Sequence, residues 1–247
     1  MSDDPEPGSG GEQHPGEPRA RRGTLLVVAT PIGNLDDLSP RARTAFERAD
    51  MVACEDTRRT GRLLAQLGIG RPLVSLHEHN ERQRLPQLLA ALGRGATVAL
   101  ASDAGTPLVS DPGYLLVREA AAAGFRVEPV PGPSAVLAAL IASALPPYPF
   151  TFAGFPPPRA GKRRSFYREL AGLGHTVVVF ESPHRLIASL DDAIAELGDR
   201  PAAVCRELTK LHEEVLRGPL SELREEMAGR AALKGEFVVV IGKQAAR

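Results

Sequence analysis

Short apolar runs alternate with longer amphipathic segments along most of the chain from Thr24 onward. In the first half, the apolar runs that favour strands span 24–29, 51–54, 73–76, 96–101 and 126–130. The helical patterns between and after them span 39–49, 57–67, 81–93, 113–123 and 133–144. Regular alternation of strands and helices is typical of a mostly parallel sheet with helices on both faces. The pattern therefore predicts an N-terminal α/β domain over residues 23–144.

Residues 145–149, Leu-Pro-Pro-Tyr-Pro, interrupt this alternation and predict a linker. After the linker, strand patterns span 150–154, 176–180, 202–206, 213–217 and 236–241, and helical patterns span 162–171, 183–197 and 219–228. The close spacing of the third and fourth strands predicts a hairpin, which makes the second sheet mixed. We therefore predict an α/β fold with two sequential domains, the second over residues 150–243.

Composition changes the picture at the N-terminus. Residues 1–22 are rich in Pro, Gly and charge and contain almost no large apolar side chain. Such a segment cannot bury enough apolar surface to offset its ordering entropy, so we predict a disordered tail. Two cysteines, and the lack of a signal-like or membrane-spanning apolar run, lead us to expect a cytoplasmic protein without a disulfide framework.

The balanced net charge argues against attraction of the whole chain to a polyanion. Lys plus Arg and Asp plus Glu each number 30, so no net field draws the chain to DNA, RNA or a membrane. Contact with a polyanion must therefore come from local basic patches. We expect neither DNA nor a membrane as a partner.

Three loops that follow predicted strands are chemically unusual. They are TPIGN (30–34), SDAGTPLVSDPG (102–113) and PGPS (131–134). Ligands of open α/β sheets bind beyond the carboxyl ends of the strands, and glycine lets the backbone approach a ligand closely. The loops offer the hydroxyls of Ser102, Thr106 and Ser134 and the carboxylate of Asp103, but no Lys or Arg and no nucleotide-phosphate motif. They therefore suit a neutral or cationic ligand, although Ser134 and Asp111 also fit a simpler interpretation as helix caps.

Longer motifs extend through the rest of the chain. They are TPIGNLDDLSPRA (30–42), EDTRRTGRLL (55–64), HEHN (77–80), SDAGTPLVSDPG (102–113), PGPSA (131–135), GF (154–155), ESPHR (181–185), RELTKLHEE (206–214) and GEFVVVI (235–241). In this order and spacing, over residues 23–242, the chain resembles the ribosomal small-subunit RNA 2′-O-methyltransferases of the tetrapyrrole methylase superfamily. The resemblance implies a homodimer that binds S-adenosylmethionine (SAM) in the cleft between two α/β domains. It also implies methylation of the 2′-hydroxyl of a cytidine, cytidine 1402, in the decoding region of 16S rRNA within the small ribosomal subunit.

The matching motifs also imply the residues of the cofactor pocket. They are Pro31, Ser102, Asp103, Ala104, Gly105, Thr106, Pro131, Gly132, Pro133 and Ser134. Asp103 occupies the place of the acidic residue in the Gly-rich loop of the superfamily. Its carboxylate is expected to face the positively charged part of the cofactor.

Methyl transfer to a ribose hydroxyl requires that oxygen, methyl carbon and sulfur are aligned, and a nearby base assists by removing the hydroxyl proton. The residues suited to that role are Asp103, Glu55, Asp56, Glu181, His184 and Glu207. We take Asp103, Glu55 and Glu181 as the catalytic candidates, and the sequence does not choose among them. A helix cap or a surface ion pair is the alternative for each.

Local basic clusters are the candidate RNA contacts. They are Arg58 and Arg59 with Arg62, Arg82 with Arg84, Lys162 with Arg163 and Arg164, and His184 with Arg185. Phosphate contacts by such side chains make binding salt-dependent, whereas a solvated charged face is the alternative for each cluster. Lys162–Arg164 follows Gly161 and a Pro-rich stretch, so we expect it to be the most loop-like cluster and the main RNA contact. With no Trp and three Tyr, recognition by shape and backbone should dominate over base stacking.

Other chemistries have less support. His77 and His79 have the spacing of metal ligands but no clear third partner, so we expect no metal. Ser182 beside His184 lacks the G-x-S-x-G context of a hydrolase nucleophile. Two alternatives remain: a methylase that acts on a tetrapyrrole, and a noncatalytic ribosome-binding module on a degenerate methylase scaffold. The EDTRRTG, ESPHR and RELTK motifs argue against the first, and the intact cofactor loops argue against the second.

Overall fold

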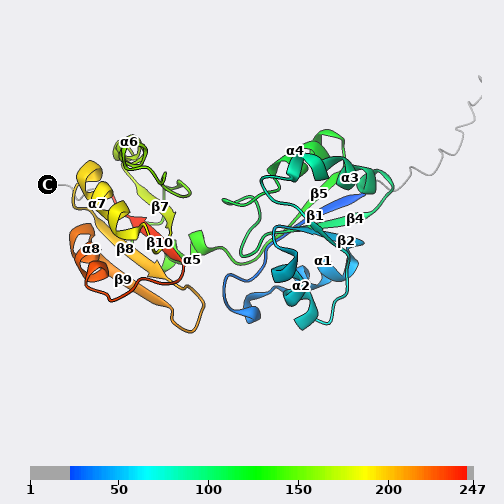
Figure 1. The fold of residues 1–247 in the computed structure, drawn as a ribbon, viewed down its shortest axis with the longest axis horizontal. Coiled ribbons are helices and arrows are strands. Elements are labelled where there is room, and N and C mark those ends of the chain that lie inside the picture. The colour runs from blue at the N-terminus through cyan, green and yellow to red at the C-terminus, as the bar shows by residue number, and fades with distance from the viewer. Residues whose placement is uncertain (1–22, 244–247) are drawn as a thin grey trace, which may run out of the picture.

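The computed structural model describes residues 23–243, so the predicted tail at 1–22 lies outside the described residues. Residues 23–243 fold into two α/β units, each built on a five-stranded sheet, which lie side by side in Figure 1. Within that range, no helix is both long and apolar enough to span a membrane.

The first sheet has the strand order β3-β2-β4-β1-β5, and all its pairings are parallel. Its strands are β1 (Thr24–Val28), β2 (Met51–Cys54), β3 (Leu73–Ser75), β4 (Thr97–Ala101) and β5 (Arg126–Val130). The helices of this unit are α1 (Pro40–Arg48), α2 (Thr57–Gln66), α3 (Glu81–Gly93) and α4 (Tyr114–Ala122), with a short 3-10 turn, η1, at Leu35–Asp37.

Side-chain alternation along β1 explains why helices cover both faces of the first sheet. Leu25 belongs to the apolar cluster of Leu88 and Leu116, from α3 and α4. The next residue, Leu26, belongs to the cluster of Phe46, from α1. Successive side chains of a strand point to opposite faces, so a strand with consecutive apolar residues contributes to two cores.

The second sheet has the strand order β6-β7-β10-β8-β9. Its strands are β6 (Phe150–Phe152), β7 (Thr176–Glu181), β8 (Pro201–Arg206), β9 (Glu214–Pro219) and β10 (Phe237–Ile241), and its helices are α6 (Ala160–Ala171), α7 (Leu186–Leu197) and α8 (Leu220–Ala228). Only the β6–β7 pair is parallel, and β8 and β9 form the predicted hairpin. The predicted fold class, with a parallel first sheet and a mixed second sheet, is confirmed.

Helix α5 (Ala135–Ala142) packs differently from the sequence expectation. The pattern places residues 133–144 in the first domain, yet Val136, Ala139 and Leu140 share one apolar cluster with Val178 and Val240 of the second sheet. The chain therefore crosses between the two packing units at 131–134, before α5 (Figure 1). The predicted linker at 145–149 follows α5 and is bound to the second unit, because the Thr176 hydroxyl donates to the Pro146 carbonyl at 2.7 Å.

The basic cluster expected to be loop-like lies instead within α6. Arg163 is buried between α6 and α7, where its Nε donates to Asp192 Oδ2 at 2.8 Å and its Nη1 donates to the Pro158 carbonyl. Arg164 Nε donates to the other carboxylate oxygen of Asp192 at the same distance. The expectation that Arg163 contacts RNA is therefore wrong, because a buried guanidinium that is already paired is not accessible to a phosphate.

Replacing Asp192 with Ala would leave Arg163 buried without its carboxylate. Because desolvation of an unpaired charge is costly, we expect the free energy of unfolding to fall by about 3 kcal/mol or more in denaturant titrations. Asp191→Ala is the matched control on the same helix, since its pair with Arg224 is exposed and is worth less than about 1 kcal/mol. Small and equal losses for both variants would contradict this account.

Candidate functional site

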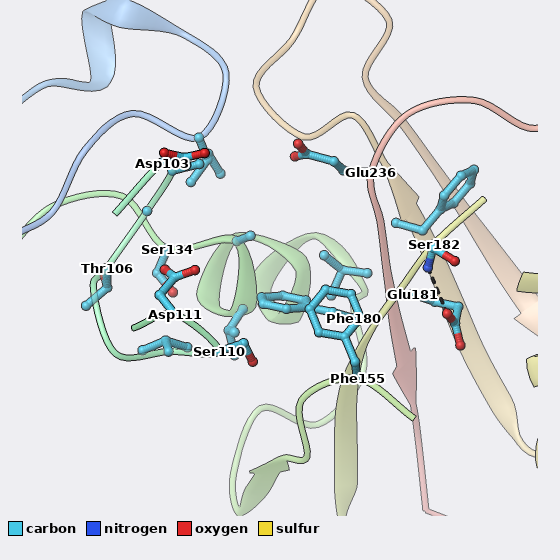
Figure 2. Close-up of a pocket in the computed structure, with 18 of the residues that line it drawn as sticks. Asp103, Thr106, Ser110, Asp111, Ser134, Phe155, Phe180, Glu181, Ser182 and Glu236 are labelled. Atoms are coloured by element: carbon cyan, nitrogen blue, oxygen red, sulfur yellow. Dashed lines mark hydrogen bonds between the residues drawn. The ribbon is translucent and has the colours of Figure 1, made fainter. Parts of the chain in front are cut away.

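A cavity of about 350 Å³ lies at the junction of the two units. Its wall from the first unit is the loop that follows β4, and its wall from the second unit includes the end of β7 and the start of β10. The first residues of α5 close it between the two (Figure 2). The volume falls within the range of about 300 to 1,000 Å³ that is usual for small-molecule sites.

The loop after β4 is fixed by backbone contacts to the loop after β1. Thr30 N donates to the Gly105 carbonyl at 2.9 Å, and Gly105 N donates to the Thr30 carbonyl at 3.0 Å. Gly105 has φ +79°, a left-handed conformation that favours glycine. The Ser102 hydroxyl is buried and lies 3.4 Å from the carbonyls of Ala104 and Gly105. Ser102 therefore shapes the loop rather than contacting a ligand.

Half of the predicted cofactor residues reach the cavity. Asp103, Ala104, Gly105, Thr106 and Ser134 line it, whereas Pro31, Ser102, Pro131, Gly132 and Pro133 do not. The second group supports the first: the Thr106 hydroxyl donates to the Pro133 carbonyl at 3.2 Å. A Cβ on Gly132 would lie 3.0 Å from the Cβ of Ala29, so a side chain at this connection would be tightly packed.

Asp103 links the cavity wall to helix α2. Its Oδ1 accepts a hydrogen bond from the Asp56 backbone N–H at 3.1 Å, and its Oδ2 lies 3.5 Å from Arg59 Nη1. Arg59 also lines the cavity, so this wall presents a carboxylate and a guanidinium together. Both oxygens of Asp103 are therefore already engaged.

Two further carboxyls lie near Asp103. The pKa of Glu55 is raised by burial and by the charge of Asp103, and Glu55 does not line the cavity. Asp111 does line it, and burial raises its pKa to about 6, against a smaller lowering by its hydrogen bond with Ser102. The sequence suggested Asp111 only as a helix cap. Its position in the same Gly- and Pro-rich loop as Asp103 was the signal that it belongs to the site.

Glu181 is among the residues that line the cavity, but its carboxylate is turned toward the other face of the second sheet (Figure 2). Val177, Val179 and Glu181 alternate along β7 on the face covered by α6 and α7, whereas Val178 and Phe180 face α5. The side chain of Glu181 is fully buried, with its Oε1 2.9 Å from Arg185 Nη2. Figure 2 shows its carboxylate turned away from Asp103 and Asp111. Glu181 therefore borders the cavity without presenting its carboxylate to it, and its catalytic role stays a prediction.

Arg185 is occupied inside the second unit. Besides its ion pair with Glu181, its Nε donates to the Ser182 hydroxyl at 3.1 Å and its Nη1 donates to the Pro156 carbonyl at 3.2 Å. It thus ties the end of β7 to the loop that carries Phe155. Its structural role is to hold this cavity wall, whereas its neighbour His184 is exposed and remains a candidate for RNA contact.

The wall from the second unit is apolar and aromatic, and the sequence did not predict it. The rings of Phe155 and Phe180 lie 5.4 Å apart in an edge-to-face arrangement and line the cavity with Val238. Figure 2 shows these rings on the side opposite Asp103 and Asp111. The cavity therefore has one polar wall, with two carboxylates and the Arg59 guanidinium, and one wall of rings. The carboxylates and rings together suit an organic cation with a flat apolar part.

The raised pKa of Asp111 predicts how the stability of the fold changes with pH. Because its pKa is raised above the usual 3.8 to about 6, the folded chain binds more protons than the unfolded chain between these values, and stability declines as pH rises through this window. Asp111→Asn removes the titration. We expect its stability relative to the wild type to increase between pH 4 and pH 7 by on the order of 1 kcal/mol, a value discounted for partial exposure.

Denaturant titrations across this pH range would measure the difference. Asp37→Asn, at an exposed position in η1, is the control. A stability difference between Asp111→Asn and the wild type that is the same at every pH would contradict the prediction.

Comparison with known proteins agrees with this architecture. The family described as Tetrapyrrole (Corrin/Porphyrin) Methylases matches residues 24–224. The chain is 50% identical over 221 residues to "Ribosomal RNA small subunit methyltransferase I" of Xylella fastidiosa (strain Temecula1 / ATCC 700964), covering 89% of this chain and 81% of that protein. It is 51% identical over 222 residues to the protein of the same name from Mycobacterium tuberculosis (strain ATCC 25618 / H37Rv), covering 89% and 77%.

Solved structures show the same fold at low sequence identity. Uroporphyrin-III-C-methyltransferase from Thermus thermophilus has a TM-score of 0.61 at 23% identity, covering 90% of this chain and 95% of that one. The cobalt precorrin-4 methyltransferase has a TM-score of 0.66 at 20% identity, covering 92% and 97%. The resemblance seen in the motifs is confirmed. Because the family match runs from β1 to α8, through both units, the chain belongs to the tetrapyrrole methylase family.

Proposed function

We propose that this protein transfers a methyl group from SAM to the 2′-hydroxyl of a cytidine in the decoding region of 16S rRNA. Relatives about half identical over most of the chain are named as small-subunit rRNA methyltransferases, which supports rRNA as the substrate. The observation that carries the proposal is the cavity between the units, where the carboxylates of Asp103 and Asp111 face the rings of Phe155 and Phe180 (Figure 2).

The residues that line the cavity fit SAM. When bound, SAM supplies a methyl group that its positively charged sulfonium already activates. Asp103 and Asp111 would hold the cationic part, and the rings of Phe155 and Phe180 would pack against the flat adenine. The backbone of the loop at Gly105 allows close approach without a side chain. These residues would bind and orient the donor.

The proposed RNA contacts are exposed basic side chains of both units. Arg58 and Arg62 are exposed on α2, the helix that also carries Arg59 to the cavity wall. From the second unit, Lys162 and His184 are exposed. Because the whole chain has no net charge, such local cations must supply the phosphate contacts, and binding should weaken with added salt.

We also propose that the protein acts on the small ribosomal subunit as a homodimer in the cytoplasm. Leu137 and Ile141 are 51% and 80% exposed on one face of α5, and Tyr148 is 88% exposed just beyond it. Exposed large apolar side chains that share one helix face, as Leu137 and Ile141 do, are typical of an interface. Both cysteines are buried free thiols, in keeping with a reducing compartment.

The direct test of the reaction uses small subunits from a strain that lacks this protein. Incubation with the purified chain and methyl-labelled SAM, followed by nuclease digestion and mass spectrometry, should yield one 2′-O-methylcytidine in the decoding region. Asp103→Asn should weaken SAM binding by about tenfold or more in calorimetry, because it removes a charge beside a cation. Asp191→Asn, far from the cavity on α7, is the control.

Three other results would each contradict part of the proposal. Label on a base, rather than on ribose, would refute the 2′-O assignment. SAM binding without transfer to subunits would refute the rRNA substrate and favour a tetrapyrrole. Failure to bind SAM at all would favour a noncatalytic ribosome-binding module.

A further inference from the structure

The loop between β8 and β9 has an unusual backbone. Glu207 and Thr209 have φ +50° and +66°, left-handed conformations that side-chain-bearing residues rarely adopt. Each costs on the order of 1–3 kcal/mol and persists only where the surroundings fix it, most often at functional sites. Thr209 is β-branched, which makes the conformation more costly. The side chains that this loop positions are therefore candidates for a functional role.

The loop holds a cluster of three charged side chains. Lys210 Nζ lies 2.9 Å from Glu207 Oε1 and 3.1 Å from Glu236 Oε2. Glu207 Oε1 also accepts the backbone N–H of Glu236 at 2.9 Å. Gly235 has φ +97°, and a Cβ there would lie 2.6 Å from the Glu207 carboxyl, so this turn requires glycine. Glu207 and Lys210 are thus fixed against the start of β10.

Lys210 and Glu207 are both charged at neutral pH. Burial alone would lower the pKa of Lys210, but its hydrogen bonds with Glu207 and Glu236 outweigh burial and raise it. The pKa of Glu207 is lowered, chiefly by the hydrogen bond with Lys210. Lys210 therefore remains an ammonium and cannot itself accept a proton.

The cluster also contacts the first unit. A Cβ on Gly33, in the loop after β1, would collide with Cγ of Lys210 and lie 2.8 Å from the Thr209 hydroxyl. That hydroxyl is buried without a hydrogen-bond partner among the described residues. The strained loop therefore spans the junction of the two units at the edge of the cavity.

Glu236 is the member of the cluster that lines the cavity. Its side chain is 67% exposed, and its Oε2 is held by Lys210. Figure 2 shows its carboxylate turned toward the side of Asp103, across the cavity. A ribose that enters from solvent can reach this carboxylate, whereas Asp103 is engaged on both oxygens and Glu181 points into the other face of the sheet.

We propose that Glu236 is the residue that accepts the proton of the acceptor hydroxyl, and that Lys210 is a positioning residue that holds the Glu236 carboxylate. This inference rests on the proposed methyl transfer. As the ribose oxygen forms its bond to the methyl carbon, the carbon–sulfur bond breaks and its electron pair goes to sulfur. The hydroxyl proton moves to Glu236 and from there to solvent, because the carboxylate is exposed.

The test compares Glu236→Gln, Lys210→Met and Lys210→Arg with wild type, and Glu225→Gln, exposed on α8, is the control. In single-turnover transfer to small subunits, Glu236→Gln should be slower by about 100-fold or more, with SAM affinity in calorimetry within twofold of wild type. Lys210→Met should be slower by a smaller factor, and Lys210→Arg should recover part of the rate.

A binding measurement separates direct contact from a structural role. A hydrogen bond from the target hydroxyl to a carboxylate should make wild type bind the ribose form of a target RNA about tenfold more tightly than the same RNA with 2′-deoxycytidine at that position. In Glu236→Gln this preference should shrink to about twofold or less, since a neutral acceptor makes a weaker bond.

The outcomes are distinguishable. Wild-type transfer together with an unchanged rate in Glu236→Gln would overturn this inference and leave the proposed function standing. Loss of SAM affinity in Glu236→Gln would also overturn it, because the carboxylate would then belong to the cofactor site. No transfer by the wild type would overturn the proposed function and this inference with it.

Discussion

The packing of α5 across the junction of the two units is the constraint on which the site depends. The helix follows the first sheet in sequence, yet Val136, Ala139 and Leu140 are buried against the second sheet. Because its first turn also lines the cavity, burial of this apolar face fixes the loops of the first sheet at a set distance from β7 and β10. Without that burial, the carboxylate wall and the aromatic wall would belong to two separate surfaces.

Most of the fold follows from local pattern. Every predicted helix and strand between residues 24 and 241 is present, with ends displaced by a few residues, because consecutive apolar residues such as Leu25 and Leu26 mark strands buried on both faces. The assignment of α5 to a domain could not follow in the same way. Its sequence, AVLAALIA, is apolar all round and gives no indication of which sheet it contacts.

The part of the candidate site that lies within one loop could be predicted from the sequence. The part that depends on tertiary contacts could not. Asp103 and Gly105 line the cavity as expected, since Gly and Pro in the loop already constrain its backbone. The alternation along β7 shows that Glu181 and Phe180 point to opposite faces of the sheet. The sequence does not say which of these faces α5 covers. The burial of Arg163 depends on Asp192, far away in sequence, and the exposure of Glu236 at the cavity depends on the turn at Gly235. No local pattern encodes such pairings.

The central claim is that both units contribute to one cofactor site. Hydrogen–deuterium exchange of the wild-type chain with and without SAM tests it most directly, since exchange reports local opening segment by segment. The account predicts slower exchange on SAM addition in 102–111 of the first unit and, at the same SAM concentration, in 235–238 of the second. Slowing confined to one unit, or to segments away from the cavity, would contradict it.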